Sequence, residues 1–255
     1  MRVQAPDRDP LADVEAVPWQ RLEHAYGPAI DVPAVLRAVR TDDERADGAI
    51  DQLLSTIWHQ GTVYSATAEA VPFVAALALD EDLPVKRRAL LGLLLFSIAR
   101  GEGYYLVHGA EDAPRSEDVP ARLEEETIVV AKCRRAVAQV VPAFIEGARA
   151  AALPRPVWYA AVGLALTTGV STDIRKLREQ PPAELPPFAQ EGTAMLQALA
   201  DGPVARDEAH RVAVLDEDLE DYFDSEMVDI DAVDRDHYFV DLLVERMIGA
   251  EIDRT

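Results

Sequence analysis

Four apolar, helix-forming runs in this chain each contain a proline in a similar setting. The runs are Asp31–Leu36, Ala70–Ala75, Val140–Ile145 and, more loosely, Leu185–Phe188. Pro33, Pro72 and Pro142 are separated by 39 and 70 residues, and Pro187 follows 45 residues later. Such steps are close to one or two lengths of a helical-pair repeat of about 40 residues. Because each pair would leave an apolar face that only a stacked neighbour can cover, the spacing predicts an all-α fold, a right-handed α-solenoid.

The composition favours helices over sheets. Apolar residues make up 49% of the 255 residues and aromatic residues only 6%, and no stretch alternates well enough to predict a strand. We expect a loose lead-in over residues 1–15 and one continuous helical domain over 16–255. Within it we expect an irregular loop near 100–118, an acidic segment at 216–236 and a terminal capping helix at 238–252. We also expect a long helix from about Val119 to Ala152 and a buried helix over Trp158–Leu166. The apolar residues of the long helix that should face inward are Ile128, Cys133, Val137 and Val140.

Charge and hydropathy restrict the compartment and the partners. The longest apolar run, Ala89–Ala99, is 11 residues long, whereas a bilayer span needs about 20. The first ten residues are polar and there is one cysteine, Cys133, which together indicate a cytoplasmic protein without a membrane segment. A net charge of −21 repels nucleic acid and favours a partner with a basic surface.

The most polar and aromatic cluster of the chain lies between Trp58 and Tyr64. As a recognition pocket, it would use the side chains of Trp58, His59, Gln60, Thr62 and Tyr64. As a structural element, its two aromatic rings would wedge between helices while Gln60 and Thr62 satisfy helix ends. The segment His59–Thr62 is expected to end or bend the preceding helix.

A second candidate surface is the acidic segment 216–236, which carries 11 acidic residues against one arginine. Large apolar residues interleave with the acids, and such a mixture suits docking on a basic surface with an apolar centre. A solvated cap is the alternative interpretation. The candidate binding residues are Asp218, Asp221, Tyr222 and Asp224, and charge reversal at the three aspartates should weaken binding and slow association.

No motif points to catalysis, a cofactor or a metal. The five histidines form no i, i+4 pair, and neither HExxH nor CxxC occurs; a structural zinc site needs about four suitably spaced ligands. There is no GxSxG, P-loop or GxGxxG. Cys133 lies at a position typical of a buried helix face, where a cysteine packs as a small hydrophobe.

Two segments, Glu69–Leu77 and Val140–Ile145, resemble the "ala-val-pro-x-leu" inner helix of bacterial HEAT-repeat proteins. The stretch Trp58–Thr67 also resembles a signature of actinobacterial HEAT-like proteins. The resemblance covers about residues 30–200. It departs from the family at the weak fourth proline, at the long loop near 100–118 and at the acidic segment. It implies a binding scaffold without fixed chemistry, since such proteins bind other proteins, sometimes nucleic acid, and a few are enzymes.

Two functional hypotheses follow from these observations. The first is a non-catalytic scaffold that recognises a basic protein, in its sharpest form an immunity protein or antagonist that covers a basic toxin. The second is an enzyme or small-molecule-binding protein with its pocket around Trp58–Tyr64, where His59 would be the group that transfers protons. The oligomeric state is not predicted.

Overall fold

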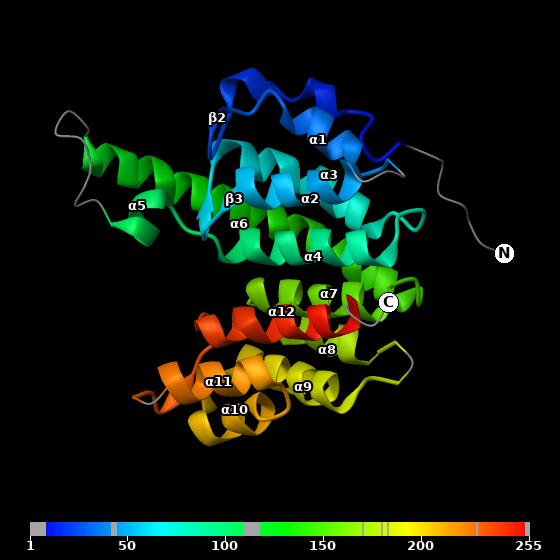
Figure 1. Ribbon diagram of the computed structural model, residues 1–255, viewed down its shortest axis with the longest axis vertical. Coiled ribbons are helices and arrows are strands. Elements are labelled where there is room, and N and C mark those ends of the chain that lie inside the picture. Colours follow the sequence, from blue (N-terminus) through cyan, green and yellow to red (C-terminus); the bar gives the residue numbers. More distant parts are fainter. Residues whose placement is uncertain are drawn as a thin grey trace. The chain divides into compact units, whose positions relative to one another are not determined.

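The computed structural model describes residues 9–41, 45–109, 118–169, 171–179, 181–182, 184–227 and 229–252. Over these ranges the chain is predominantly helical, with twelve α-helices and three short antiparallel strand pairs that the sequence did not predict (Figure 1). None of the helices in these ranges combines the length and apolar composition needed to cross a membrane. The chain packs as two compact units, Met1–Val137 and Ala138–Thr255. The single domain expected over 16–255 stays a prediction.

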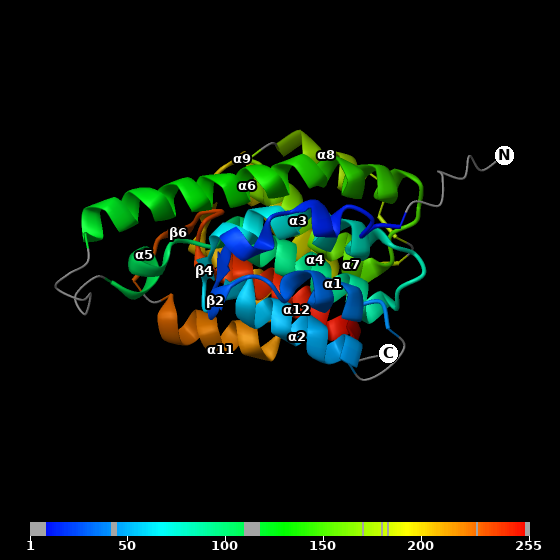
Figure 2. The same ribbon diagram turned by 90° about the horizontal axis from the view of Figure 1, so that it is seen from above.

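The first unit is built on two helical pairs. Its elements are the 3-10 helices η1 (Val14–Ala16) and η2 (Trp19–Arg21), the strands β1 (Glu23–His24), β2 (Gly27–Pro28), β3 (Trp58–His59) and β4 (Thr62–Val63), and the helices α1 (Val32–Ala38), α2 (Arg45–Thr56), α3 (Ser65–Leu79), α4 (Val85–Arg100) and α5 (Tyr104–His108). Helix α1 packs on α2, α3 on α4, and α2 on α4 (Figures 1 and 2). Their shared core includes Leu36, Ile50, Leu77, Leu91 and Phe96, all buried.

The turn between α3 and α4 shows why these two helices pair. Asp80 ends α3, and its carboxylate accepts a hydrogen bond from the N–H of Asp82 at 3.1 Å, a local turn that aspartate favours. The guanidinium of Arg88 on α4 is buried and donates from Nε to the carbonyl of Ala78 at 3.1 Å. This bond satisfies a carbonyl that the end of α3 leaves without a helical partner. Burial lowers the pKa of Arg88 from its ordinary value.

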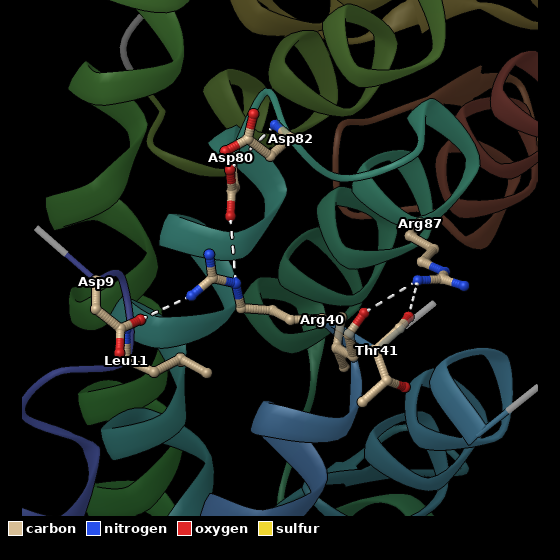
Figure 3. Close-up of polar contacts among 8 residues, drawn as sticks. Asp9, Leu11, Arg40, Thr41, Asp80, Asp82 and Arg87 are labelled. Atoms are coloured by element: carbon tan, nitrogen blue, oxygen red, sulfur yellow. Dashed lines mark hydrogen bonds and ion pairs between the residues drawn. The ribbon is translucent and has the colours of Figure 1, made fainter. Parts of the chain in front are cut away.

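Two arginines tie the end of α1 to its neighbours (Figure 3). Arg40 lies between two carboxylates, with Nη1 2.8 Å from Asp9 Oδ1 and Nε 3.6 Å from Asp80 Oδ2. Arg87 Nη1 donates to the carbonyl of Thr41 at 2.6 Å. These contacts reach into the expected lead-in 1–15, where Leu11 is buried rather than loose; residues 1–8 lie outside the described residues.

Helix α6 (Val119–Arg149) begins in the first unit and ends in the second. The long helix predicted from about Val119 is therefore confirmed. Cys133 and Val137 are buried, as expected. Ile128, which was expected to face inward, is 50% exposed, and the nearby Val130 is buried instead.

The four prolines occupy two kinds of helical position. Pro33 lies in the first turn of α1, and Pro187 in the first turn of α9 (Pro187–Asp201). Pro72 and Pro142 lie inside α3 and α6, where proline removes a backbone hydrogen bond. The prolines therefore do not mark one equivalent point in successive repeats, and the solenoid stays a prediction.

The second unit surrounds one buried helix, α7 (Arg155–Thr167), in which every residue from Pro156 to Leu166 is buried. The other elements are the end of α6, α8 (Ser171–Arg178), α9, β5 (Val204–Ala205), α10 (Arg206–Ala213), α11 (Glu217–Glu226), β6 (Ala232–Val233) and α12 (Tyr238–Ile252). Helices α8, α9 and α12 pack directly on α7. The terminal helix thus has the predicted bounds 238–252. Its buried Glu251 holds it to α7 through an ion pair with Arg155 Nη2 at 2.8 Å.

The irregular loop expected near 100–118 differs in its first part. Residues 104–108 form α5, which begins after Gly103. The remainder, residues 110–117, lies outside the described residues. Helix α5 buries none of its side chains, and Tyr104 and Leu106 are 51% and 54% exposed.

Candidate functional site

The Trp58–Tyr64 segment is a β-hairpin. Helix α2 ends at Thr56, before the segment His59–Thr62 that was expected to end or bend it. Strands β3 and β4 then pair with the register Trp58↔Val63 and His59↔Thr62. The two turn residues, Gln60 and Gly61, have φ values of 48° and 85°. Two successive residues with positive φ make the tight turn that matches strand twist. Gly61 is the sequence feature that could have indicated this turn. The strands themselves could not be predicted, because two residues are too few to show alternation of apolar and polar side chains.

The hairpin is held in place by the segment after α4. The N–H of Val63 donates to the carbonyl of Glu102 at 3.0 Å, and the N–H of Glu102 donates to the carbonyl of Gly61 at 2.8 Å. A side chain at Gly101 would not fit, because its Cβ would lie 2.5 Å from Val63 Cγ1. Packing and backbone bonds therefore fix the position of the hairpin in the first unit.

The five predicted pocket residues do not all reach the surface. Thr62 is buried at 1% exposure, so its side chain does not line an open surface. Trp58, His59 and Tyr64 are half-buried and Gln60 is exposed. The indole N–H of Trp58 is buried and finds no hydrogen-bond partner within the described part of the chain.

The structure adds residues from three other elements to the hairpin. The ring of Tyr26, which is 68% exposed, lies 5.7 Å from the His59 ring. Burial raises the pKa of Tyr64 above its ordinary value; the Thr62 hydroxyl opposes the rise, while Tyr26, Tyr104 and Glu126 add to it. No motif joins Tyr26, Tyr104 and Glu126 to the hairpin, because they come together only through tertiary packing.

Glu126 of α6 positions α5 beside the hairpin. Its carboxylate accepts the N–H of Tyr105 in the first turn of α5, at 3.1 Å from Oε2. Gly103 permits this approach, since a Cβ there would lie 2.3 Å from Glu126 Oε2. Within α5, the centroid of the Tyr104 ring lies 5.5 Å from that of Tyr105 and 4.7 Å from that of His108.

His24, near the hairpin, makes a close contact with a carboxylate. His24 Nε2 lies 2.9 Å from Asp31 Oδ1, and His24 Nδ1 accepts the N–H of Tyr26 at 3.0 Å. Because Nδ1 is an acceptor, Nε2 carries the proton and donates to Asp31. Both ring nitrogens are engaged and the residue is buried, so His24 holds the β1–β2 turn rather than transferring protons.

Within the acidic segment 216–236, residues 217–226 form α11 and residues 232–233 form β6. Asp216 is the N-cap of α11, and its Oδ1 accepts the N–H of Leu219 at 3.2 Å. Arg246 of α12 donates to both oxygens of Asp216 at 2.9–3.1 Å and pairs with Asp218. The carboxylate of Asp218, a predicted binding residue, is therefore already paired with Arg246 within the second unit.

The other predicted residues of α11 lie on an open surface. Asp221 and Asp224 are exposed, and among the described residues the ion-pair partner of Asp224 is His210, whose Nε2 lies 3.9 Å from Asp224 Oδ1. Tyr222 is half-buried and its ring lies 5.5 Å from that of Tyr238, which is 59% exposed. Burial raises the pKa of Tyr222, and Glu226, Tyr238 and Asp241 add to the rise. Acids thus lie around this aromatic pair, of which Tyr238 is the exposed member, and we call it the Tyr222–Tyr238 surface.

The described residues do not assemble a metal or thiol centre. Within these ranges, no three His, Cys, Asp or Glu side chains are grouped so that they could hold a metal ion. Cys133 is buried, and burial raises the pKa of its thiol to about 12. At neutral pH this thiol is protonated and weakly nucleophilic.

Comparison with known proteins leaves the family open. No family model matches this sequence, and the comparisons found no match among curated proteins or solved structures. The resemblance to HEAT-repeat proteins therefore rests on the quoted sequence segments, and membership stays a prediction.

Proposed function

We propose that this chain is a non-catalytic binding protein that recognises a basic surface of another protein through the Tyr222–Tyr238 surface. The observation that carries the proposal is an aromatic pair, with one ring exposed and the other half-buried, set among the exposed acids of α11. Tyrosine is enriched among the residues that contribute most to protein–protein binding, because it offers a large rigid surface with a polar tip. An acidic rim around such an anchor selects a basic partner.

Unpaired carboxylates give this surface its charge. Glu217, Glu220, Asp221 and Glu226 are exposed, and none has an ion-pair partner among the described residues. Carboxylates left without cations in the free protein can pair with lysine or arginine on a partner without first breaking internal contacts. The charge of the whole chain, −21, adds long-range attraction and speeds the encounter.

The finer parts of the proposal concern architecture and partner. We infer a HEAT-like stack of helical pairs as the scaffold, supported by the paired helices α1–α2 and α3–α4 in the first unit. An antagonist that covers a basic toxin, such as a nuclease, is the partner class that suits the charge best. The acidic field disfavours nucleic acid and anionic lipid as ligands.

A second candidate function uses the hairpin of the first unit. The exposed Tyr26 ring against His59, with Tyr64 half-buried beside them, supports recognition of a small molecule or a partner group there. The described residues around His59 offer its ring no hydrogen-bonding carboxylate, which favours binding over proton transfer. The experiment below separates the two surfaces.

The test is affinity capture from a lysate of the source organism with three matched baits. The first bait carries Asp221→Asn, Tyr222→Ala and Asp224→Asn. A charge-matched control carries Asp51→Asn and Glu69→Gln, which change two exposed acids of the first unit. The third bait carries His59→Ala, and all three are compared with the wild type. We expect a basic protein to bind the wild type and the charge-matched control, and to be lost from the first bait. Tyr222→Ala alone should weaken binding about tenfold, or about 1.4 kcal/mol.

Kinetics with the captured partner then test the mechanism. Association of the wild type should slow as salt is raised, and replacing Asp221 and Asp224 should flatten that dependence. Equal capture by the first bait and the wild type would refute the proposal. Loss confined to the His59→Ala bait would move the function to the hairpin.

A further inference from the structure

The two rings of the Tyr222–Tyr238 surface form a preformed pair with an outer face. Their centroids lie 5.5 Å apart and their planes are inclined by 60°. A third group between two rings needs a centroid separation of about 7 Å, which is two van der Waals contacts. The pair therefore accepts nothing between its rings and can bind a group only on its outer face. Tyr238 provides that face, since it is 59% exposed while Tyr222 is half-buried.

Each ring has a carboxylate one helical turn further along its own helix. Glu226 follows Tyr222 by four residues on α11, and Asp241 follows Tyr238 by three residues on α12. Residues at these spacings share one face of a helix. Burial is the main cause of the raised pKa of Tyr222, and both carboxylates add to it, which agrees with their closeness to the phenol. Two acids from two helices thus flank the aromatic pair.

The surroundings favour a cation over these rings, and within the described ranges none is placed there. Helix α11 has no basic residue in its last turn, where Glu226 lies and where the helix dipole attracts cations. Another ring of α11 shows the occupied arrangement, because Arg206 Cζ lies over the Phe223 ring at 4.8 Å from its centroid. In the described part of the chain, no such cation covers the ring of Tyr222 or of Tyr238.

We propose that the Tyr222–Tyr238 surface binds an arginine side chain of the basic partner. This inference rests on the proposed function and names the group that the surface selects. A guanidinium is planar and weakly hydrated, so it can lie flat on the exposed face of Tyr238 while the N–H groups at its edge donate to Glu226 and Asp241. The ammonium group of lysine has the same charge but is compact and strongly hydrated, and it cannot stack in this way. The surface should therefore distinguish arginine from lysine, which charge alone does not.

Short peptides test this inference without the partner. The probes are acetylated, amidated Gly-Xaa-Gly-Xaa-Gly peptides in which Xaa is arginine, lysine or citrulline, the uncharged analogue of arginine. Binding to the full chain is followed by NMR of isotope-labelled tyrosine rings at about 150 mM salt, where long-range attraction is screened. We expect the arginine peptide to bind about threefold or more tightly than the lysine peptide, and about tenfold more tightly than the citrulline peptide.

Variants place the binding at the aromatic pair. Tyr238→Leu removes the ring face and should weaken binding of the arginine peptide about threefold or more, whereas Tyr238→Phe keeps the face and should bind within about twofold of the wild type. Glu226→Gln should also weaken binding about threefold, because it removes a charge-assisted hydrogen bond. Tyr26→Leu changes an exposed tyrosine of the first unit and should bind like the wild type. An unchanged helical circular-dichroism spectrum shows that each variant is folded.

The arginine site and the proposed function fail by different results. Equal binding of the arginine and lysine peptides, no binding of the arginine peptide, or unchanged binding by Tyr238→Leu would overturn the arginine site. Equal weakening by Tyr26→Leu and Tyr238→Leu would overturn it as well. The proposed function fails instead when the bait that carries Tyr222→Ala captures the basic protein as well as the wild type does. A preference for arginine together with such capture would support the arginine site and place the captured partner elsewhere.

Discussion

Removal of the Asp216 carboxylate should destabilise the second unit more than removal of any neighbouring acid. Asp216 caps α11 and accepts the guanidinium of Arg246, and its side chain is only 9% exposed. Loss of an N-cap costs about 1 kcal/mol. A charge-assisted bidentate pair adds about 1–2 kcal/mol, a figure reduced because Arg246 is 35% exposed and keeps Asp218 as a partner. We therefore expect Asp216→Ala to lower the free energy of unfolding by about 2–3 kcal/mol.

Three variants separate the two contributions. Asp216→Asn keeps an oxygen that can cap the helix but loses the charge, so it should cost about 1 kcal/mol less than Asp216→Ala. Arg246→Ala removes the pair and leaves the cap. Its combination with Asp216→Ala completes a double-mutant cycle in which we expect a coupling of about 1 kcal/mol. Asp221→Ala serves as the control, because its exposed carboxylate has no ion-pair partner among the described residues.

Urea unfolding followed by far-UV circular dichroism gives the free energies, and hydrogen exchange measured on peptides from α11 gives the local effect. Loss of the cap should speed exchange of the first amides of α11, including that of Leu219. Stabilities of Asp216→Ala and the wild type within about 0.5 kcal/mol of each other, the range of ordinary surface substitutions, would refute the reasoning.

Two further predictions concern the first unit. Burial raises the pKa of the Cys133 thiol to about 12, from its ordinary value of 9.0. As pH rises, the thiol therefore loses its proton in the unfolded chain before it does so in the folded protein. Its contribution to the free energy of unfolding is complete below pH 9 and declines above it. At pH 10 this decline should reach about 1.4 kcal/mol. Urea unfolding at pH 8 and pH 10 should show it in the wild type but not in a Cys133→Ala variant. An equal loss of stability between the two pH values in both proteins would contradict the prediction. Gly103→Ala should lower the free energy of unfolding by about 1–3 kcal/mol, because the new Cβ would meet the Glu126 side chain. Gly48 lies inside α2, where an added Cβ would have nothing within 4 Å. Gly48→Ala should therefore be neutral or stabilising by up to about 1 kcal/mol. Thermal unfolding of the two variants checks this contrast, and equal effects would contradict it.

The long helices could be predicted from the sequence because their evidence is local. The apolar run near Trp158, the terminal stripe from Tyr238 and the long segment after Val119 each contain enough residues to show helical periodicity. The β3–β4 hairpin could not be predicted in this way, since two residues per strand are too few to alternate. Ile128 was predicted to face inward but is exposed. The apolar periodicity shows which residues share one face of a helix, but not which turns of that face are covered by other helices.

The candidate sites were predictable only in part. Tyr222, Asp221 and Asp224 were identified because acids and aromatic residues are adjacent in the sequence, and the structure leaves them exposed or half-buried. The role of Asp218 was not predictable, because its partner Arg246 comes from a different helix.

The boundary between the two compact units falls inside α6, after Val137. A protein fragment that ended there would leave the last carbonyls of one new helix end and the first N–H groups of the other without partners. Pro142 already removes the N–H that would bond to the carbonyl of Ala138, the first residue of the second unit. Fragments prepared for NMR or for mapping a partner should therefore keep the whole of Val119–Arg149, and limited proteolysis should spare this boundary and cut in loops instead.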